Sequence, residues 1–316
     1  MKTEASGGVR AKVQARNSAI AGASAGFVSS IVTCPLDVIK TRLQVGTASR
    51  SHSGVRNVAH IVAQIWHDDG LRGYYRGLVP TMVGYLPTWA IYFVVYDKGK
   101  NVYARLFHRP NSSRDHNTGT HEFLTHTCSA LTAGIVSTVC TSPLWVVKTR
   151  TMLQTSKQPI DSRYRNILDA FRKIYSKEGL GGFYKGLLPS LLGVFHVVVQ
   201  FPLYEYFKSI AANRQHSDSL STSSILLCSG GSKMLASIAT YPHEVLRTRL
   251  QMVPQSDRTQ YTGLIRAVKY IYHHEGPKGF YRGMGVNLIR TVPNSGLTLL
   301  TYEMIMRHLD PLHSSP

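Results

Sequence analysis

A proline-led cassette occurs three times in this chain of 316 residues. Each copy carries a base that is followed directly by threonine and arginine. The copies are Pro35-Leu-Asp-Val-Ile-Lys-Thr-Arg42, Pro143-Leu-Trp-Val-Val-Lys-Thr-Arg150 and Pro242-His-Glu-Val-Leu-Arg-Thr-Arg249. Downstream of each come an acid–glycine pair and an aromatic–base–glycine triplet: Asp69-Gly70 and Tyr75-Arg76-Gly77, Glu178-Gly179 and Tyr184-Lys185-Gly186, Glu275-Gly276 and Tyr281-Arg282-Gly283. Because both motifs recur in step at intervals of about 100 residues, the chain is predicted to be one body of three related units.

The chain is strongly basic, with 36 Lys and Arg residues against 17 Asp and Glu residues and a formal net charge of +19. Such an excess favours anionic partners, which include nucleic acid, lipid headgroups and small anions. The basic residues are spread singly through apolar stretches, without a compact basic arm, so we expect no nucleic-acid partner. Membrane lipid and an anionic small-molecule solute remain as the expected partners.

The four cysteines are interpreted as packing residues, since Cys34, Cys128, Cys140 and Cys228 lie in apolar segments without Cys-x-x-Cys spacing. We expect no metal site and no cofactor. Residues 1–16 contain no apolar core, so no secretory signal peptide is expected.

Six segments have the length and content of membrane helices, at about 15–44, 75–105, 122–154, 184–212, 221–251 and 282–308. None is uniformly apolar, which favours helices with one stripe toward lipid and another toward a solvated cavity. A shorter amphipathic segment lies in each unit, at 58–66, 167–175 and 264–272, and is expected to lie along the membrane surface. We therefore predict an all-α membrane protein with a tail at 1–16 and repeats at 17–108, 109–213 and 214–312, integrated into one transmembrane domain.

Each cassette proline lies inside a predicted long helix, so Pro35, Pro143 and Pro242 are expected to kink their helices. In the first and third cassettes an acid and a base share one helical face, where they could pair with neighbouring units as a breakable ring of charges. The residues of this cassette ring are Asp37, Lys40, Trp145, Lys148, Glu244 and Arg247. Because Trp145 stands where the second acid is expected, Arg247 is left without its expected partner.

A second set of charges, here called the outer ring, lies toward the other end of the second, fourth and sixth predicted helices. It consists of Asp97, Lys100, Glu205, Lys208 and Glu303, and each acid follows a tyrosine: Tyr96, Tyr204 and Tyr302. Met306 stands where the third base is expected. Alternating access needs two gates that close in turn, and the two rings supply one on each side of a midplane cavity. The sequence thus predicts a membrane transporter.

The cassette with its two downstream partners is similar to the signature of the mitochondrial carrier family, and the resemblance covers essentially the whole chain. It implies six transmembrane helices in three pseudo-symmetric repeats, each with a short surface helix in the matrix. It also implies a multi-pass protein of the mitochondrial inner membrane, with both termini toward the intermembrane space. A monomer would suffice, because three repeats enclose one cavity.

The resemblance further implies that the cassette ring is a matrix gate and the outer ring a cytoplasmic gate. The implied ion pairs are Asp37–Lys148, Glu244–Lys40, Asp97–Lys208 and Glu303–Lys100. Gln44 and Gln251 would brace the matrix gate by hydrogen bonding, whereas Met152 replaces the brace of the second repeat. The three tyrosines would brace the cytoplasmic gate.

Within the family, Trp145 is typical of the branch that carries NAD, FAD, folate and pyrimidine nucleotides, and residues 232–234 and 241–245 agree with that branch. Residues 87–93 and 193–205 look most like those of NAD+ carriers. The resemblance implies transport of NAD+ or a related nucleotide, with exchange for a nucleotide such as AMP. A carrier of pyrimidine nucleotides, FAD or folate is the alternative within the branch.

Family members contact their solutes at fixed positions before the acid of the outer ring, which correspond here to Gly84, Tyr85, Leu192, Gly193, Arg290 and Thr291. Arg290 is the strongest candidate, because a guanidinium in a cavity can bind phosphate bidentately, although a structural ion pair is the alternative. Gly193 would let a flat ring approach the backbone, unless it serves packing. Lys233 stands where the other units have glycine, and a lysine at that depth is expected to meet solute or a gating partner. Further candidates are Trp89, His196 and Gln200.

The aromatic–base–glycine turns resemble the cardiolipin sites of the family, where helix amino ends meet phosphate. The residues expected at these lipid sites are Arg76, Gly77, Lys185, Gly186, Arg282 and Gly283.

Two functions of other classes are disfavoured. A nucleotide-using enzyme would need a phosphate loop after a strand, a His-Glu-x-x-His motif or a nucleophile constellation, and we find none. A proton-leak or scaffold protein would leave Arg290 unexplained, and proton conductance without solute exchange would reveal a leak.

Overall fold

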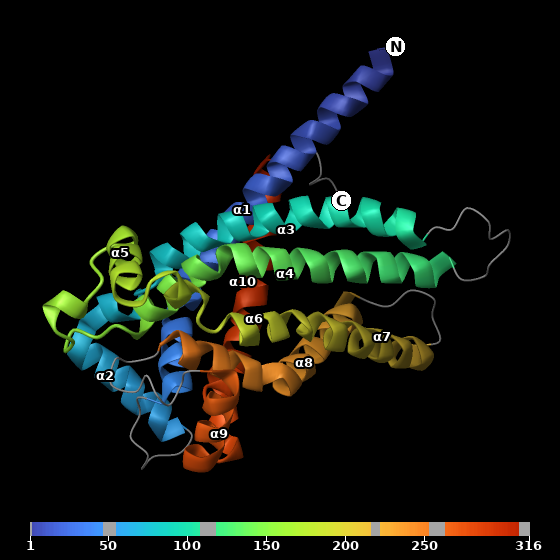
Figure 1. Ribbon diagram of the computed structural model, residues 1–316. Coiled ribbons are helices and arrows are strands. Elements are labelled where there is room, and N and C mark those ends of the chain that lie inside the picture. Colours follow the sequence, from blue (N-terminus) through green and yellow to red (C-terminus); the bar gives the residue numbers. More distant parts are fainter. Residues whose placement is uncertain (1, 47–54, 108–117, 216–221, 253–262, 310–316) are drawn as a thin grey trace.

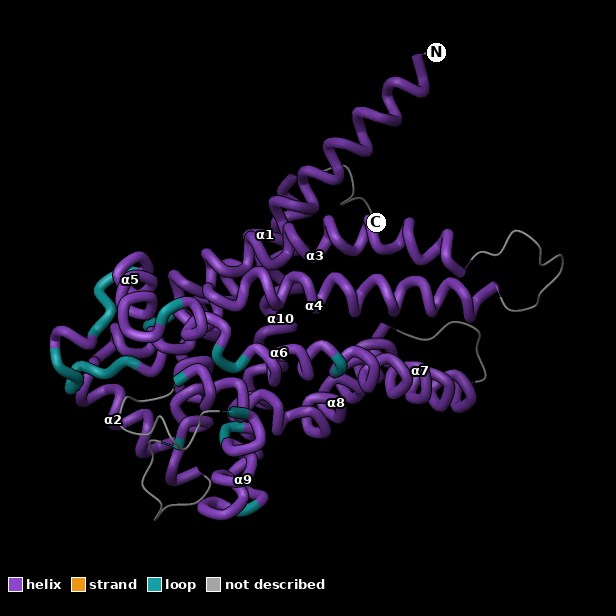
Figure 2. Tube along the Cα trace, in the orientation of Figure 1, coloured by secondary structure: helices purple, strands orange, loops and turns teal. Residues whose placement is uncertain are grey.

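The computed structural model describes residues 2–46, 55–107, 118–215, 222–252 and 263–309, and these residues form helices and turns without a strand (Figure 1, Figure 2). The long helical segments are α1 (Lys2–Val45), α3 (Leu78–Phe107), α4 (Thr118–Leu153), α6 (Leu187–Val194) with α7 (His196–Gln215), α8 (Thr222–Gln251) and α10 (Met284–Leu309). The shorter helices are α2 (Val55–Tyr74), α5 (Ile167–Glu178) and α9 (Leu264–Glu275). Single turns of 3-10 helix occur at Ile160–Ser162, Leu180–Tyr184 and Pro277–Tyr281. The predicted all-α architecture is confirmed.

The long helices pack as pairs that join one repeat to the next. α3 packs along α4, α7 along α8, and α1 along α10, so the last pair closes the bundle between the first and third repeats. Figure 1 shows α3 and α4 side by side. The three cassette helices α1, α4 and α8 also contact one another, which brings the three cassettes together.

The cassette prolines lie inside their helices, because α1, α4 and α8 continue on both sides of Pro35, Pro143 and Pro242. The bend expected at each proline stays a prediction. The continuation beyond each proline carries the charged part of the cassette toward the centre of the bundle.

The three short helices bury equivalent apolar residues against the cassette helices. Ile61 and Ile65 of α2 pack with Val38 and Leu43 of α1. The second repeat does the same with α4 and α5, and the third with α8 and α9. Only part of the predicted apolar stripe of each short helix is buried. The remaining part, here called the exposed apolar half-face, includes Trp66 of α2, Tyr175 of α5 and Tyr272 of α9. This exposed apolar half-face is available to a membrane surface.

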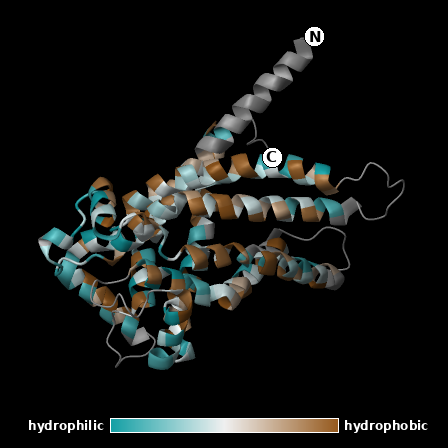
Figure 3. Cartoon of the chain, in the orientation of Figure 1, coloured by the Kyte–Doolittle hydropathy of each residue, from teal (hydrophilic) through white to brown (hydrophobic). Residues whose placement is uncertain are grey.

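Four helical segments among the described residues are long and apolar enough to cross a membrane: Ala21–Val45, Leu78–Phe107, His121–Leu153 and Leu180–Ala212. Figure 3 shows hydrophobic residues distributed along α3 and α4. α8 and α10 are not among these four segments, because their polar, glycine and charged residues lower their mean hydropathy. These helices complete the six predicted segments because they pack along α7 and α1.

Two predicted segments have different ends from those expected. α1 begins at Lys2, so residues 2–16 of the segment expected as a tail are helical. The segment expected as one helix at 184–212 begins with a 3-10 turn and is then divided into α6 and α7 at Phe195. There the N–H of Phe195 donates to the carbonyl of Leu192 at 3.2 Å, a 3-10 contact in place of the α-helical one. Gly193 favours this interruption, because glycine has a lower helix propensity than the residues around it. The predicted repeat boundary at 108–109 lies outside the described residues.

The acid–glycine and aromatic–base–glycine motifs meet the last arginine of each cassette in three equivalent clusters. Asp69 binds Arg42 at 2.8 Å and Arg76 at 2.9 Å. In the second repeat Glu178 binds Arg150 and Lys185, both at 2.6 Å. In the third repeat Glu275 binds Arg249 at 2.6 Å and Arg282 at 3.2 Å. Each cluster thus ties a cassette helix to its short helix and to the start of the next long segment.

The acidity of Glu178 makes this second cluster testable. Burial acts to raise the pKa of Glu178, but hydrogen bonds from Arg150 and Lys185 outweigh it and lower the pKa from 4.5 to about 2. Because the folded pKa lies below the unfolded one, the resulting stabilisation is complete above about pH 5 and is lost as the pH falls toward 2. Glu178→Gln is therefore expected to destabilise the protein at neutral pH by on the order of 2 kcal/mol, and this difference should shrink as the pH falls through that window.

Thermal unfolding in detergent at about pH 7, 5 and 3 measures this dependence. Glu122→Gln is the matched control, because Glu122 is exposed and makes no ion pair with a described residue. A gap between wild type and Glu178→Gln that stays constant from neutral to acid pH would show that the cluster does not stabilise through this charge.

Candidate functional site

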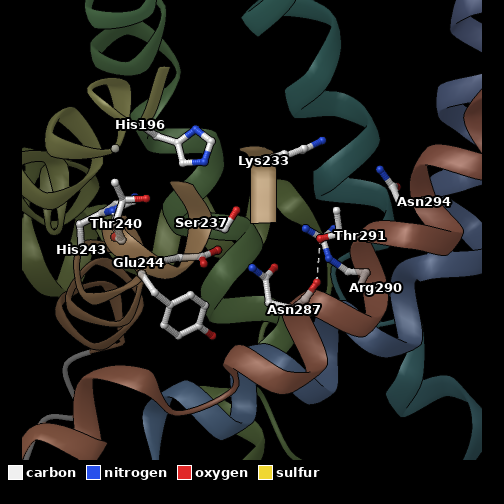
Figure 4. Close-up of a pocket in the computed structure, with 12 residues that line it drawn as sticks. His196, Lys233, Ser237, Thr240, His243, Glu244, Asn287, Arg290, Thr291 and Asn294 are labelled. Atoms are coloured by element: carbon white, nitrogen blue, oxygen red, sulfur yellow. Dashed lines mark hydrogen bonds between the residues drawn. The ribbon is translucent and has the colours of Figure 1, made fainter. Parts of the chain in front are cut away.

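A polar cavity of about 250 Å³ lies between α8, α10 and the junction of α6 with α7 (Figure 4). Its lining residues are Gly193, His196, Lys233, Ser237, Thr240, Tyr241, His243, Glu244, Asn287, Arg290, Thr291 and Asn294. Two of them, Lys233 and Arg290, are cations from different helices. A cavity with cations and several hydrogen-bonding groups suits an anionic solute that also carries hydroxyl or amide groups.

Helical periodicity explains why these side chains share one cavity. On α8 the lining positions 233, 237, 240, 241 and 244 recur at steps of three or four residues, and on α10 the positions 287, 290, 291 and 294 do the same. Each set lies on one face of its helix, and Figure 4 shows these faces turned toward each other. The apolar faces of α8 and α10 are thereby free to pack on neighbouring helices.

Of the residues predicted to contact solute, five line this cavity: Gly193, His196, Lys233, Arg290 and Thr291. The other five do not line it. Gly84 is buried near the Leu144 side chain, Tyr85 lies edge-on to Trp145 at 5.6 Å, and Trp89 stacks on Phe93 at 5.6 Å. Leu192 is exposed and Gln200 is half-buried. Their contact with solute stays a prediction.

The close approach at Gly193 is made by a side chain of the protein itself. A Cβ atom at this position would lie 2.7 Å from Nε2 of His243. The flat ring that meets the backbone of Gly193 is thus the imidazole of His243, and the glycine serves packing here. Contact of a solute ring with this backbone stays a prediction, and it would require the His243 ring to move aside.

Sequence reasoning missed several lining residues, namely Ser237, Thr240, His243, Asn287 and Asn294. Four of them could have been found from the sequence, because Ser237, Thr240, Asn287 and Asn294 lie three, four or seven positions from a predicted contact residue on the same helix. His243 lies ten positions from Lys233. None of these residues is an Asp, Glu, Lys or Arg residue, so a search for charged residues within the predicted membrane helices did not find them.

The cassette ring is closed by an ion pair between the first and third cassettes. Lys40 binds the carboxylate of Glu244, and its Nζ also donates to Oδ1 of Asn287 at 2.8 Å. The Lys40 side chain is only 9% exposed, whereas that of Glu244 is 33% exposed. The pair therefore joins α1 to α8 at the buried end of the cavity, where Glu244 forms part of the lining.

Asp37 does not pair with Lys148, which corrects one predicted bridge of this ring. Its Oδ1 instead accepts a hydrogen bond from the guanidinium of Arg290 at 2.9 Å. The reason is the packing of α10 along α1, which brings Arg290 within reach of the carboxylate. Arg290 thus lines the cavity and also makes the ion pair that the sequence left as its alternative role.

Trp145 holds the two cations that lack a carboxylate. Nζ of Lys148 lies 4.8 Å from the Trp145 ring centroid, and the Arg247 guanidinium lies 5.8 Å from it. The indole N–H donates to the hydroxyl of Thr141 at 3.2 Å. Among the described residues, neither Lys148 nor Arg247 forms an ion pair. Cation–π contacts therefore replace the ion pairs that an acid at position 145 would make.

The two predicted braces, Gln44 and Gln251, each bind the threonine of another cassette, and so does Met152. Gln44 accepts from Thr248 at 2.8 Å and donates to the Tyr241 hydroxyl at 3.0 Å. In the same way Thr149 donates to Gln251 at 2.7 Å. Thr41 donates to the Met152 sulfur at 3.7 Å, the weakest contact of the three. These cassette threonines are further functional candidates. The charge pattern of the sequence did not indicate them, because threonine is uncharged.

The outer ring is open in this structure. Its five charged residues, Asp97, Lys100, Glu205, Lys208 and Glu303, are all exposed and form no ion pair with any residue that the structure describes. Tyr96 hydrogen-bonds to Nδ1 of His126 at 2.8 Å and not to this ring, while Tyr204 and Tyr302 are half-buried. The two outer ion pairs expected from the sequence are therefore not formed in this conformation, in which only the cassette ring is closed.

The bases of the predicted lipid sites are already bound to carboxylates, since Arg76, Lys185 and Arg282 belong to the three acid clusters. Gly77, Gly186 and Gly283 adopt φ angles of 88°, 77° and 83° directly before α3, α6 and α10. At Gly186 a Cβ would lie 2.9 Å from the carbonyl oxygen of Arg247, so the turn requires glycine. Lipid binding at these helix starts stays a prediction, and it would depend mainly on backbone N–H groups.

Comparison with known proteins gives the same three-part organisation. A family model described as mitochondrial carrier protein matches residues 11–106, 119–215 and 218–311. The chain is 42% identical over 300 residues to a mitochondrial nicotinamide adenine dinucleotide transporter of Saccharomyces cerevisiae, with 92% of this chain and 77% of that protein covered. It is 42% identical over 294 residues to a mitochondrial nicotinamide adenine dinucleotide transporter of Arabidopsis thaliana, with 91% and 78% covered. A mitochondrial pyrimidine nucleotide transporter of Saccharomyces cerevisiae is 32% identical over 329 residues, with 92% and 85% covered.

The repeated helix pairs, the polar cavity and the two rings of charge together define a membrane solute carrier. The chain belongs to the mitochondrial carrier protein family.

Proposed function

We propose that this protein carries NAD+ across the mitochondrial inner membrane by alternating access, in exchange for a nucleotide such as AMP. The observation that carries the proposal is the polar cavity with Lys233 and Arg290, found in a chain that is 42% identical to two NAD transporters. A pyrophosphate-linked dinucleotide offers anionic oxygens for the cations and ribose hydroxyls for the polar side chains.

The state of the two rings supports alternating access. The Lys40–Glu244 pair closes one end of the bundle, while the charged residues at the other end are exposed. Solute would enter through the open outer ring and reach the cavity beside the closed cassette ring. Opening of the cassette ring and closure of the outer ring would then release it on the opposite side.

The finer topology belongs to the same proposal. We infer that the outer ring faces the intermembrane space with both termini, and that the cassette ring faces the matrix. One chain is sufficient for transport, because the polar cavity is lined by helices of one chain and α1 packs along α10 to close the bundle. Cardiolipin would bind where α3, α6 and α10 begin, since helix amino ends attract phosphate.

A second candidate is a carrier of pyrimidine nucleotides, FAD or folate. It is favoured by the 32% identity to a pyrimidine nucleotide transporter across 92% of this chain. All these solutes are anionic, so Lys233 and Arg290 suit each of them. Discrimination must come from the neutral polar side chains of the cavity, such as Ser237, Asn287 and Asn294.

Ligand-dependent thermal unfolding of the purified protein tests the choice of solute. A solute that binds only the folded carrier stabilises it, by about 3 kcal/mol when present at one hundred times its dissociation constant. NAD+ is expected to raise Tm more than UTP, FAD or folate at equal concentration. A larger rise with one of these three would move the assignment to that solute, and no rise with any of them would contradict binding of this solute class.

A further inference from the structure

We propose that Lys148 and Arg247, which flank Trp145, form a phosphate subsite, in which the anion takes the place of the carboxylate that the second cassette lacks. The inference rests on the proposed function insofar as it needs an anionic solute. It assigns to the cassette ring a solute-binding role in addition to its role as a gate.

The second cassette lacks the carboxylate that the first and third cassettes supply. The first supplies Asp37, which binds Arg290 at 2.9 Å, and the third supplies Glu244, which binds Lys40. The second supplies Trp145, whose indole N–H is bound to Thr141. Only an aromatic face is therefore offered to the cations that surround the second cassette.

Lys148 and Arg247 are both held by that face and by no carboxylate among the described residues. Lys148 lies 4.8 Å from the Trp145 ring centroid and 6.0 Å from that of Tyr85. Arg247 lies 5.8 Å from the Trp145 ring. A cation–π contact is weaker than a charge-assisted hydrogen bond to phosphate oxygen, so an arriving phosphate would draw both cations from the ring.

The balance of charge at this end of the cavity favours a dianion. The cations here are Lys40, Lys148, Arg247 and Arg290, and the carboxylates are Asp37 and Glu244. Two positive charges remain without a counter-charge in the described part of the chain. Uncompensated charge inside a membrane protein is costly, and the two phosphates of a dinucleotide supply the two negative charges that are missing.

The subsite adjoins the cavity through Arg290 and Glu244, while Lys148 and Arg247 themselves lie outside its lining. Arg290 and Glu244 line the cavity, and Arg290 is among the charged groups that act on Lys148, together with Asp37, Arg247 and Lys40. Arg247 lies one helical turn beyond Glu244 on α8. A solute in the cavity can therefore reach the two cations with a phosphate while its remaining groups stay among the polar lining residues.

Inorganic pyrophosphate is the probe, because it tests the anion without the bases or riboses. Thermal unfolding of the full-length protein in detergent should show stabilisation by pyrophosphate. In Lys148→Gln and in Arg247→Gln, the concentration needed for half of this stabilisation is expected to rise about tenfold. Lys269→Gln is the matched control, since Lys269 is exposed on α9, and its response should equal that of wild type. An unchanged response in Lys148→Gln and Arg247→Gln, or no stabilisation of wild type, would overturn the proposal.

Restoring the missing acid provides an independent test. Trp145→Asp is expected to raise Tm without ligand, because a carboxylate can then pair with Lys148 and Arg247, and to abolish the response to pyrophosphate. Trp145→Phe keeps an aromatic face and is expected to retain the response. A full response in Trp145→Asp would contradict the subsite. Should this variant not fold, the Lys148→Gln and Arg247→Gln measurements decide alone.

A lipid phosphate is the other source of this chemistry, so cardiolipin is tested in place of pyrophosphate. Protection by cardiolipin should be equal in wild type and Lys148→Gln, because the subsite lies between helices inside the bundle. Loss of that protection in the variant would assign the subsite to lipid and overturn its role for solute.

The KM for NAD+ exchange separates this inference from the proposed function. A KM raised about tenfold in Lys148→Gln supports both. Exchange of NAD+ with an unchanged KM in Lys148→Gln rejects the subsite and keeps the function. A further outcome is a wild-type protein that binds pyrophosphate and yet exchanges no NAD+. If Lys148→Gln and Arg247→Gln then lose the stabilisation by pyrophosphate, the subsite is supported and NAD+ is rejected as the solute.

Discussion

Lys40→Glu is expected to abolish solute exchange and to lower the free energy of unfolding by about 3 to 5 kcal/mol, the cost of breaking a buried ion pair. The substitution would place two carboxylates against each other at the closed end of the cavity, since Glu244 is the partner of Lys40. It would also remove the hydrogen bond to Asn287. The measurements are Tm in detergent and exchange by the purified protein in liposomes.

The double variant Lys40→Glu with Glu244→Lys is expected to recover a large part of the stability and of the exchange activity, because it restores the ion pair with the two charges interchanged. Lys269→Glu makes the same change of charge on the exposed side of α9 and should have little effect. A double variant that is no more stable and no more active than the single variants would show that the pair does not close the cassette ring.

Arg290→Ala is expected to lower the kcat/KM of exchange at least about a hundredfold, because a charge-assisted contact with a dianionic solute is lost in a site of low dielectric constant. Arg290 lines the cavity and binds Asp37 at 2.9 Å, so the substitution removes both contacts. Initial rates of NAD+ exchange over a range of external concentrations give KM and kcat separately.

Asp37→Asn separates the two roles of Arg290. This variant weakens the ion pair but leaves the guanidinium in the cavity, so the KM for NAD+ should stay near that of wild type or fall. Equal increases of KM in Asp37→Asn and Arg290→Ala would show that Arg290 acts only through its ion pair.

The fold was predictable because its determinants are repeated. Three copies of one cassette, at intervals matched by three acid–glycine pairs, specify three equivalent helix pairs around one axis. The interruption at Phe195 was not predictable in the same way, since a single glycine such as Gly193 is also tolerated inside unbroken helices.

The site was predictable where a charge lies at an unexpected depth, as for Lys233 and Arg290, both of which line the cavity. Which of the charged residues pair with one another was harder to predict. The pattern of acids and bases suggested Lys148 for Asp37, but the carboxylate binds Arg290 because α10 packs along α1. The charged residues of the site could be identified from the sequence, whereas the distances between the helices determine which of them form ion pairs.

Uptake of radiolabelled NAD+ into liposomes that contain the purified protein tests the central claim most directly. The liposomes are loaded in turn with NAD+, AMP, UTP, FAD or buffer alone. We predict rapid uptake into liposomes that contain NAD+ or AMP, and loss of that uptake in Arg290→Ala. Uptake no faster than into protein-free liposomes under every loading condition would contradict NAD+ transport by this carrier.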